Sequence, residues 1–213
     1  MLNKRKKIPE SEAFDILKQL INGYKHLHEH SIIHRDLKPA NVLIKDETYK
    51  IADFGFAKYY SEGAELAQIH QSLVGSPIYM CPEILNGSTY STKSDIYSMG
   101  VMFYQMIFGK TPHRAGSLEE LIMKVNKKVI RYPQKLNDER LHMLLERMLK
   151  HSPEERISWK ELFDLELFQP KKVVQNNIKE SMRIAEGVSK NKLEMSTKMN
   201  EIYFQDKKVL RKI

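Results

Sequence analysis

A short polar loop between two apolar runs constrains this chain more than any other stretch. Residues 32–44 read IIHRDLKPANVLI, which places one carboxylate, two cations and one amide within seven residues. The carboxylate of Asp36 suits acceptance of a hydroxyl proton, and the cation of Lys38 suits a phosphoryl group in transfer. The amide oxygen of Asn41 suits a metal ion, and Asp53, further on in the run KIADFG, offers a second oxygen ligand. The two stretches together indicate chemistry on phosphate groups.

Both stretches resemble a known family. Residues 34–41 (HRDLKPAN) resemble the catalytic loop of protein kinases, and residues 53–55 (DFG) resemble the magnesium-binding motif of the same family. The alternative is a polar hairpin with an incidental DFG, which the joint match and its spacing argue against. The resemblance covers residues 10–170. It implies a mainly α (α+β) fold, that of a kinase large lobe with a small β-hairpin at the catalytic loop.

The resemblance also implies roles for individual residues, with ATP and Mg²⁺ as cofactors and a protein with Ser or Thr as substrate. Asp36 is expected to be the base and Lys38 to neutralise the transferring phosphoryl group. The Asp-Leu-Lys-Pro pattern resembles serine/threonine rather than tyrosine kinases. Asn41 and Asp53 are expected to hold Mg²⁺, and Leu43 to lie beneath the adenine. A plain core position for Leu43 is compatible with that role.

Three further residues are expected to hold the architecture. Residues 75–83 (GSPIYMCPE) resemble the end of a kinase activation segment, with Cys81 in place of the usual Ala. The resemblance implies that Glu83 pairs with Arg156, an ion pair that is costly to break from one side when it is shielded from water. Asp95 opens an apolar run, where it is expected to cap a helix and to tie it to the backbone of the catalytic loop.

Regulation is expected at the activation segment. Arg35 precedes the base, and in the family such an arginine commonly contacts a phosphate on this segment. Ser72 is the first candidate for that phosphate and Ser61 the second, although an unmodified loop serine is the alternative. Ser76 is expected to bridge the base and the lysine that follows it.

Apolar periodicity predicts the main elements. Several segments repeat apolar residues at helical spacing, and two short runs flanking a turn predict a hairpin. Four histidines, including His26 and His30 at a spacing of four, permit a metal site, but no Cys or HExxH pattern supports one. The predicted helices are 11–29, 95–108, 117–125, 138–149 and 158–167, and the predicted strands are 41–44 and 49–52.

The net charge of +8 belongs to the two ends. Residues 1–9, a basic stub, carry +4, residues 10–170 carry −2, and residues 171–213 carry +6. The last segment is predicted to be a basic tail, partly helical or disordered. Such ends can bind nucleic acid or an anionic membrane, and the alternative is a solvated tail. No apolar run predicts a transmembrane span, and the single Cys81 fits a reducing, cytoplasmic setting.

One part of a kinase has no counterpart in the sequence. A glycine-rich loop and a strand lysine would precede the catalytic loop, and no GxGxxG or VAIK-like stretch is present. The small lobe is therefore expected to be absent, and this polypeptide alone to be weak or inactive without a small lobe or a regulatory partner. A catalytically silent large lobe that acts as a binding module is the alternative. Residues 53–58 and 75–80 are most similar to ULK-type kinases, which would imply a role in autophagy.

Overall fold

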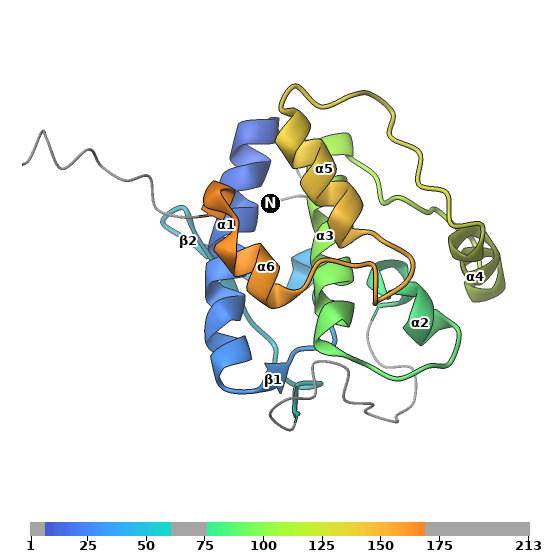
Figure 1. Ribbon diagram of the computed structural model, residues 1–213, viewed down its shortest axis with the longest axis horizontal. Helices are drawn as coiled ribbons and strands as arrows, with labels where there is room; N and C mark the ends of the chain where they lie inside the picture. The colour runs from blue at the N-terminus through green and yellow to red at the C-terminus, as the bar shows by residue number, and fades with distance from the viewer. Residues whose placement is uncertain (1–6, 61–75, 169–213) are drawn as a thin grey trace, which may run out of the picture. The chain divides into compact units, whose positions relative to one another are not determined.

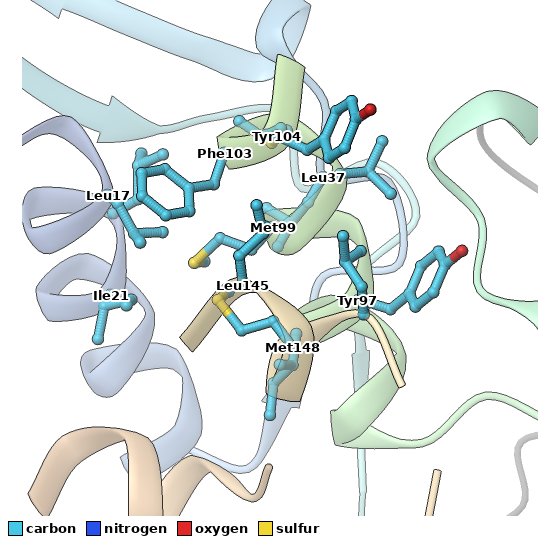
Figure 2. Close-up of a cluster of buried hydrophobic side chains, with 14 of the residues drawn as sticks. Leu17, Ile21, Leu37, Tyr97, Met99, Phe103, Tyr104, Leu145 and Met148 are labelled. Carbon is cyan, nitrogen blue, oxygen red and sulfur yellow. The ribbon is translucent and has the colours of Figure 1, made fainter. Parts of the chain in front are cut away.

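A helix that is buried on nearly every side, α3 (Thr92–Phe108), lies at the centre of the computed structural model (Figure 1). The structure describes residues 7–60 and 76–168. Met99 and Phe103 of α3 lie in a core with Leu17 of α1 (Glu10–Glu29) and Leu145 of α5 (Glu139–Met148), as Figure 2 shows. An all-round apolar helix is stable only when other elements cover it. Here α1, α5 and α6 (Trp159–Asp164) provide that cover.

Stacked aromatic rings join α1 to α6. The ring of Tyr24 in α1 lies 3.8 Å from that of Trp159, with an interplanar angle of 8°. The indole N–H of Trp159 donates to the carbonyl oxygen of Thr92 at 2.8 Å, so the buried indole keeps a hydrogen bond. α1, α3 and α6 therefore meet at one point, and the predicted helix 11–29 agrees with α1 to within one residue.

A glycine sets the distance between α3 and α5. A Cβ atom on Gly100 would lie 3.0 Å from side-chain atoms of Met148 and Leu149. Any larger residue would require these two side chains to move. The close approach lets α5 pack directly on the central helix, which is the contact visible in Figure 2.

Side-chain caps precede the later helices, at the residues with which the predicted helices 117–125, 138–149 and 158–167 began. Ser117, Asp138 and Ser158 each accept a hydrogen bond from a backbone N–H of the following turn, at 3.2, 3.0 and 3.2 Å. They precede α4 (Leu118–Asn126), α5 and α6. The start of α3 differs from its prediction, because the helix begins three residues earlier, at Thr92, and Asp95 is not its cap. Ser94 Oγ instead accepts from the N–H of Ser91 at 3.1 Å.

The predicted hairpin forms, and its turn has unusual backbone angles. β2 (Val42–Lys45) pairs antiparallel with β3 (Thr48–Ile51), and Val42 is opposite Ile51. The two turn residues, Asp46 and Glu47, have φ of 48° and 58°. Positive φ at both central positions is the requirement of a type I′ turn, which matches the twist of the strands it joins.

A second strand pair, which the sequence did not reveal, closes the segment around the hairpin. β1 (Ile32–Ile33) pairs antiparallel with β4 (Lys58–Tyr59). The residues just before the catalytic-loop stretch therefore lie beside the residues that follow the DFG motif. Short helical turns complete the described residues: Pro39–Asn41, Pro77–Tyr79, α2 (Pro82–Leu85) and Glu166–Phe168.

The two basic segments stay largely outside the described residues. The described residues begin at residue 7 and end at residue 168, so the structure does not test the predicted stub or tail. Within the described ranges, no helix has both the length and the apolarity needed to cross a membrane.

Candidate active site

The carboxylate of Asp36 is the centre of the site. Its Oδ2 accepts from Lys38 Nζ at 2.6 Å and from Asn41 Nδ2 at 3.0 Å, and its Oδ1 accepts from the backbone N–H of Ser76 at 3.1 Å. Asn41 Nδ2 also donates to the Asp36 carbonyl oxygen at 2.9 Å. Asp36 is only 4 % exposed, and donors from three positions fix its orientation. The structure thus brings four of the predicted site residues together.

The backbone of this loop is held from inside the helical core. Asp95 in α3 accepts from the N–H of His34 at 2.7 Å and from that of Arg35 at 2.9 Å. Tyr24 O–H donates to the same carboxylate at 2.6 Å. Burial and the charge of Asp95 raise the pKa of Tyr24 well above its usual value, so that the phenol stays a donor. Arg35 has φ of 67°, a strained conformation for a non-glycine residue that these contacts impose.

The side chain of Arg35 points to the segment after the DFG motif. Its Nε donates to the carbonyl oxygen of Phe56 at 2.6 Å, and its guanidinium lies 5.4 Å from the ring centre of Tyr90. Burial lowers the pKa of Arg35, although the neighbouring Tyr90 and Asp95 act in the opposite direction. The two serines predicted as phosphate carriers, Ser72 and Ser61, lie outside the described residues, so their relation to Arg35 stays a prediction.

Asn41 and Asp53 lie at the same end of the hairpin, because one precedes β2 and the other follows β3. The N–H of Ala52 donates to the carbonyl oxygen of Asn41 at 2.9 Å. Asn41 Oδ1 takes no hydrogen bond within the described residues, and Asp53 is exposed with φ of 62°. A free amide oxygen and an exposed carboxylate are hard oxygen donors of the kind that Mg²⁺ prefers. The residues present fit this ion.

The hairpin offers an apolar surface beside these ligands. Leu43 is 62 % exposed and Phe54 48 % exposed, so neither is a core residue of the described structure. Phe54 contacts the ring of His34 edge-on at 5.3 Å, and His34 Nε2 lies 3.0 Å from the carbonyl oxygen of Ala52. His34 therefore joins the catalytic loop to the DFG motif through packing.

Ser76 contacts the site differently from its prediction. Its backbone N–H reaches Asp36, whereas its hydroxyl makes no hydrogen bond to Lys38 within the described residues. Beside it, a pocket of about 410 Å³ lies between Ile78 and the start of α4, where Leu118 and Leu121 line it. Ser76, whose N–H donates to Asp36, also lines this pocket.

The two predicted anchor residues are in contact. Arg156 donates to both carboxylate oxygens of Glu83, at 2.7 and 2.8 Å, and its side chain is 0 % exposed. It also donates to the carbonyl oxygens of Lys93 and Lys150, and its guanidinium lies 5.0 Å from the ring centre of Tyr97. Burial alone would raise the pKa of Glu83, but the hydrogen bonds and charge of Arg156 outweigh it and lower that pKa.

Residues 1–168 match the protein kinase domain in a comparison with known families. The chain belongs to the protein kinase family. This confirms the predicted fold in its coarser form, a helix-rich kinase fold with few short strands.

Several serine/threonine kinases are similar to this protein kinase chain. The serine/threonine-protein kinase atg1 of Dictyostelium discoideum is 37% identical over 163 residues, which is 75% of this chain and 24% of that protein. The serine/threonine-protein kinases ULK3 of Xenopus laevis and of Homo sapiens are 39% and 36% identical, over 75% and 76% of this chain and 34% of each relative. The chain thus spans a quarter to a third of the length of these curated relatives. The resemblance to ULK-type kinases is confirmed.

Sequence reasoning missed two contributors to the kinase site. Tyr24 is a buried residue of α1, and its hydroxyl donates to Asp95 and helps to orient it. The guanidinium of Arg35 lies over the ring of Tyr90. A tyrosine at a buried helical position is a weak signal for such a role, since a buried phenol usually finds a hydrogen-bond partner.

Proposed function

We propose that this chain is the large lobe of a serine/threonine protein kinase that transfers the γ-phosphoryl group of ATP to a protein hydroxyl. The arrangement around Asp36 carries the proposal: a buried carboxylate oriented by Lys38, Asn41 and the N–H of Ser76, next to an open pocket. The similarity to ATG1 and ULK kinases supports the serine/threonine class. In this reading residues 10–170 are the large lobe, flanked by the basic stub 1–9 and the tail 171–213.

Each site residue has one task in this mechanism. Asp36 accepts the proton of the substrate hydroxyl as the oxygen attacks phosphorus. Lys38, which already contacts Asp36 at 2.6 Å, offsets the charge of the phosphoryl group in transfer. Asn41 Oδ1 and Asp53 hold Mg²⁺, which would neutralise phosphate charge when bound. Leu43 supplies the apolar surface beneath the adenine of ATP.

The family resemblance also suggests how the kinase is regulated and where in the cell it acts. Arg35 is proposed to bind a phosphate on Ser72 and so to order the activation segment. Action in the cytoplasm and a role in autophagy are what the ULK resemblance implies. The catalytic task also requires a phosphate-orienting lysine, for which the sequence shows no counterpart before residue 34. A small lobe or a partner protein is proposed to supply it.

The test is a kinase assay with Mg-ATP on this chain and on any longer natural product. Asp36→Asn is expected to lower phosphate incorporation by roughly 10²–10⁴-fold, because the substrate hydroxyl loses its base. Asp15→Asn, at an exposed position of α1, is the matched control and is expected to keep full activity. Equal incorporation by wild type and Asp36→Asn would contradict the assignment. No incorporation by any length of the wild type, with retained partner binding, would favour the silent binding module.

A further inference from the structure

A second pocket is lined by Pro82 and Glu155, the sequence neighbours of the ion-paired Glu83 and Arg156. It has a volume of about 320 Å³, and none of its lining residues belongs to the site around Asp36. That volume is at the lower end of the range for small-molecule sites, about 300–1,000 Å³. Pro82 of α2, Tyr97 of α3 and Leu149 after α5 give it apolar walls. The pocket can therefore cover the apolar part of a small molecule.

One polar atom beside this pocket has no partner. His151 lines the pocket, and its Nε2 is buried without a hydrogen bond in the described part of the chain. A buried polar group left unsatisfied destabilises a folded protein, because it has lost its hydrogen bonds to water. Such an atom requires an explanation, and a polar ligand atom that enters the pocket is one.

Two lysines and two acids line the pocket. Residues 124–131, at the end of α4 and beyond, contain four cations and no acid. Lys128 and Lys150 line the pocket, and neither forms an ion pair within the described residues. Of the two acids that line it, Glu146 is 3.5 Å from His142 Nε2, and Glu155 is exposed. In the part of the chain that the structure describes, two lysines without an ion pair outnumber the one lining acid without a partner, Glu155, and together with the apolar walls they favour an anion with an apolar body.

The backbone holds Lys128 at this position at an energetic cost. Its φ is 57°, a left-handed conformation at a place after a helix where glycine is the usual residue. Its N–H donates to the carbonyl oxygen of Val125 at 3.0 Å, which ends α4 at the edge of the pocket. A lysine is thus placed at a backbone position that disfavours it.

We propose that this pocket binds a small amphipathic anion, with its apolar body against Tyr97 and Leu149 and its carboxylate or phosphate group facing Lys128 and Lys150. The ligand would lie against the activation-segment anchor. Tyr97 carries the guanidinium of Arg156 on its ring, and the carbonyl oxygen of His151 accepts from Arg156 Nη2 at 3.3 Å. Binding there stabilises the Glu83–Arg156 pair and, through α2, the end of the activation segment.

The test is a titration of the full chain with octanoate, followed by the NMR signals of the histidine side chains. Saturable shifts of His151 are expected, with a Kd on the order of 1 mM for a probe of this size. Octyl phosphate in place of octanoate distinguishes a phosphate from a carboxylate ligand, since the better head group gives the lower Kd. Octylamine, which has the same apolar body and the opposite charge, is expected to bind more weakly than either.

A pair of variants locates the site. Lys128→Gln is expected to raise the Kd of octanoate by roughly two- to ten-fold, because one ion pair at an exposed position is lost. Lys160→Gln, on the exposed side of α6, is the matched control and is expected to leave the Kd unchanged. The proposal is overturned if octylamine binds as tightly as octanoate, if Lys128→Gln binds like wild type, or if the folded chain shows no saturable shift.

Discussion

The two sides of the candidate active site are held in different ways. On the catalytic-loop side, Asp36 is 4 % exposed and each of its carboxylate oxygens has a donor. On the hairpin side, Leu43 is 62 % exposed, and the Asp53 carboxylate accepts only the N–H of Gly55, at 3.3 Å, within the described residues. The helical core thus determines the position of the proposed base. The residues proposed to contact the nucleotide and its metal keep their surfaces free for a ligand.

The largest expected effect is on the anchor that supports the loop side. Arg156→Met leaves the Glu83 carboxylate buried without its partner and is expected to lower the free energy of unfolding by about 3–5 kcal/mol, measured by urea denaturation. Arg140→Met is the control, because its pair with Asp138 is mostly exposed, and a change of at most about 1 kcal/mol is expected there. Equal effects of the two substitutions would contradict the view that the loop side depends on a buried pair.

Acid should weaken the same anchor. The pKa of Glu83 is lower in the folded protein than its usual 4.5, so the unfolded chain takes up a proton at higher pH than the folded one. The stabilisation is therefore complete above the usual pKa and is lost as the pH falls through the folded value. Urea midpoints measured from neutral pH down to acid are expected to fall more steeply for wild type than for Glu83→Gln. Parallel curves would show that the pair does not titrate.

A smaller loss of stability is expected from substitutions at Asp95, where α3 contacts the catalytic loop. Asp95→Asn keeps the shape of the side chain but places an N–H₂ group against donors, so one donor loses its acceptor. We expect a loss of about 1–3 kcal/mol in urea denaturation. Tyr24→Phe removes only one of the three donors and is expected to destabilise by about 1 kcal/mol. A larger effect of Tyr24→Phe than of Asp95→Asn would show that the hydroxyl of Tyr24, and not the two backbone N–H groups, makes the main hydrogen bond to this carboxylate.

The smallest effect on stability is expected on the hairpin side. Leu43→Ala removes an exposed side chain and is expected to change the free energy of unfolding by less than about 0.5 kcal/mol. The same change is expected to weaken binding of Mg-ATP to a kinase-active product, measured by calorimetry, because the adenine loses apolar contact. A large loss of stability with unchanged nucleotide binding would reverse the comparison between the two sides.

The sequence predicts which residues form the loop side of the site better than it predicts the contacts that they make. Helical periodicity predicted α1, α4 and α5 to within a few residues, since each carries one apolar stripe. The family resemblance placed Glu83 beside Arg156, and the structure shows both hydrogen bonds. The role of Ser76 was harder to predict, because a backbone N–H gives no sequence signal, and it is this group that reaches Asp36.

Other features of the fold leave only a weak signal in the sequence, and each has a physical reason. β1 and β4 have two residues each, too few for any alternation to show. The start of α3 was placed too late because its first turn is polar, and the buried polar residues there, Thr92 and Ser94, look like a loop in the sequence. The Asp46–Glu47 turn lacks the glycine that usually marks a type I′ turn. The local sequence pattern predicts which helices and strands form, whereas contacts between residues far apart in the sequence determine where these elements begin and end.

The carboxylate of Asp95 has a consequence for how the catalytic loop opens. Because His34 and Arg35 donate their backbone N–H groups to a residue inside the central helix, these two amides can exchange with solvent deuterium only when the core itself opens. Their exchange rates should match those of α3 and be far slower than those of other loop amides. Warming would then release the loop and melt the core in a single step, with no intermediate in which the loop alone is disordered.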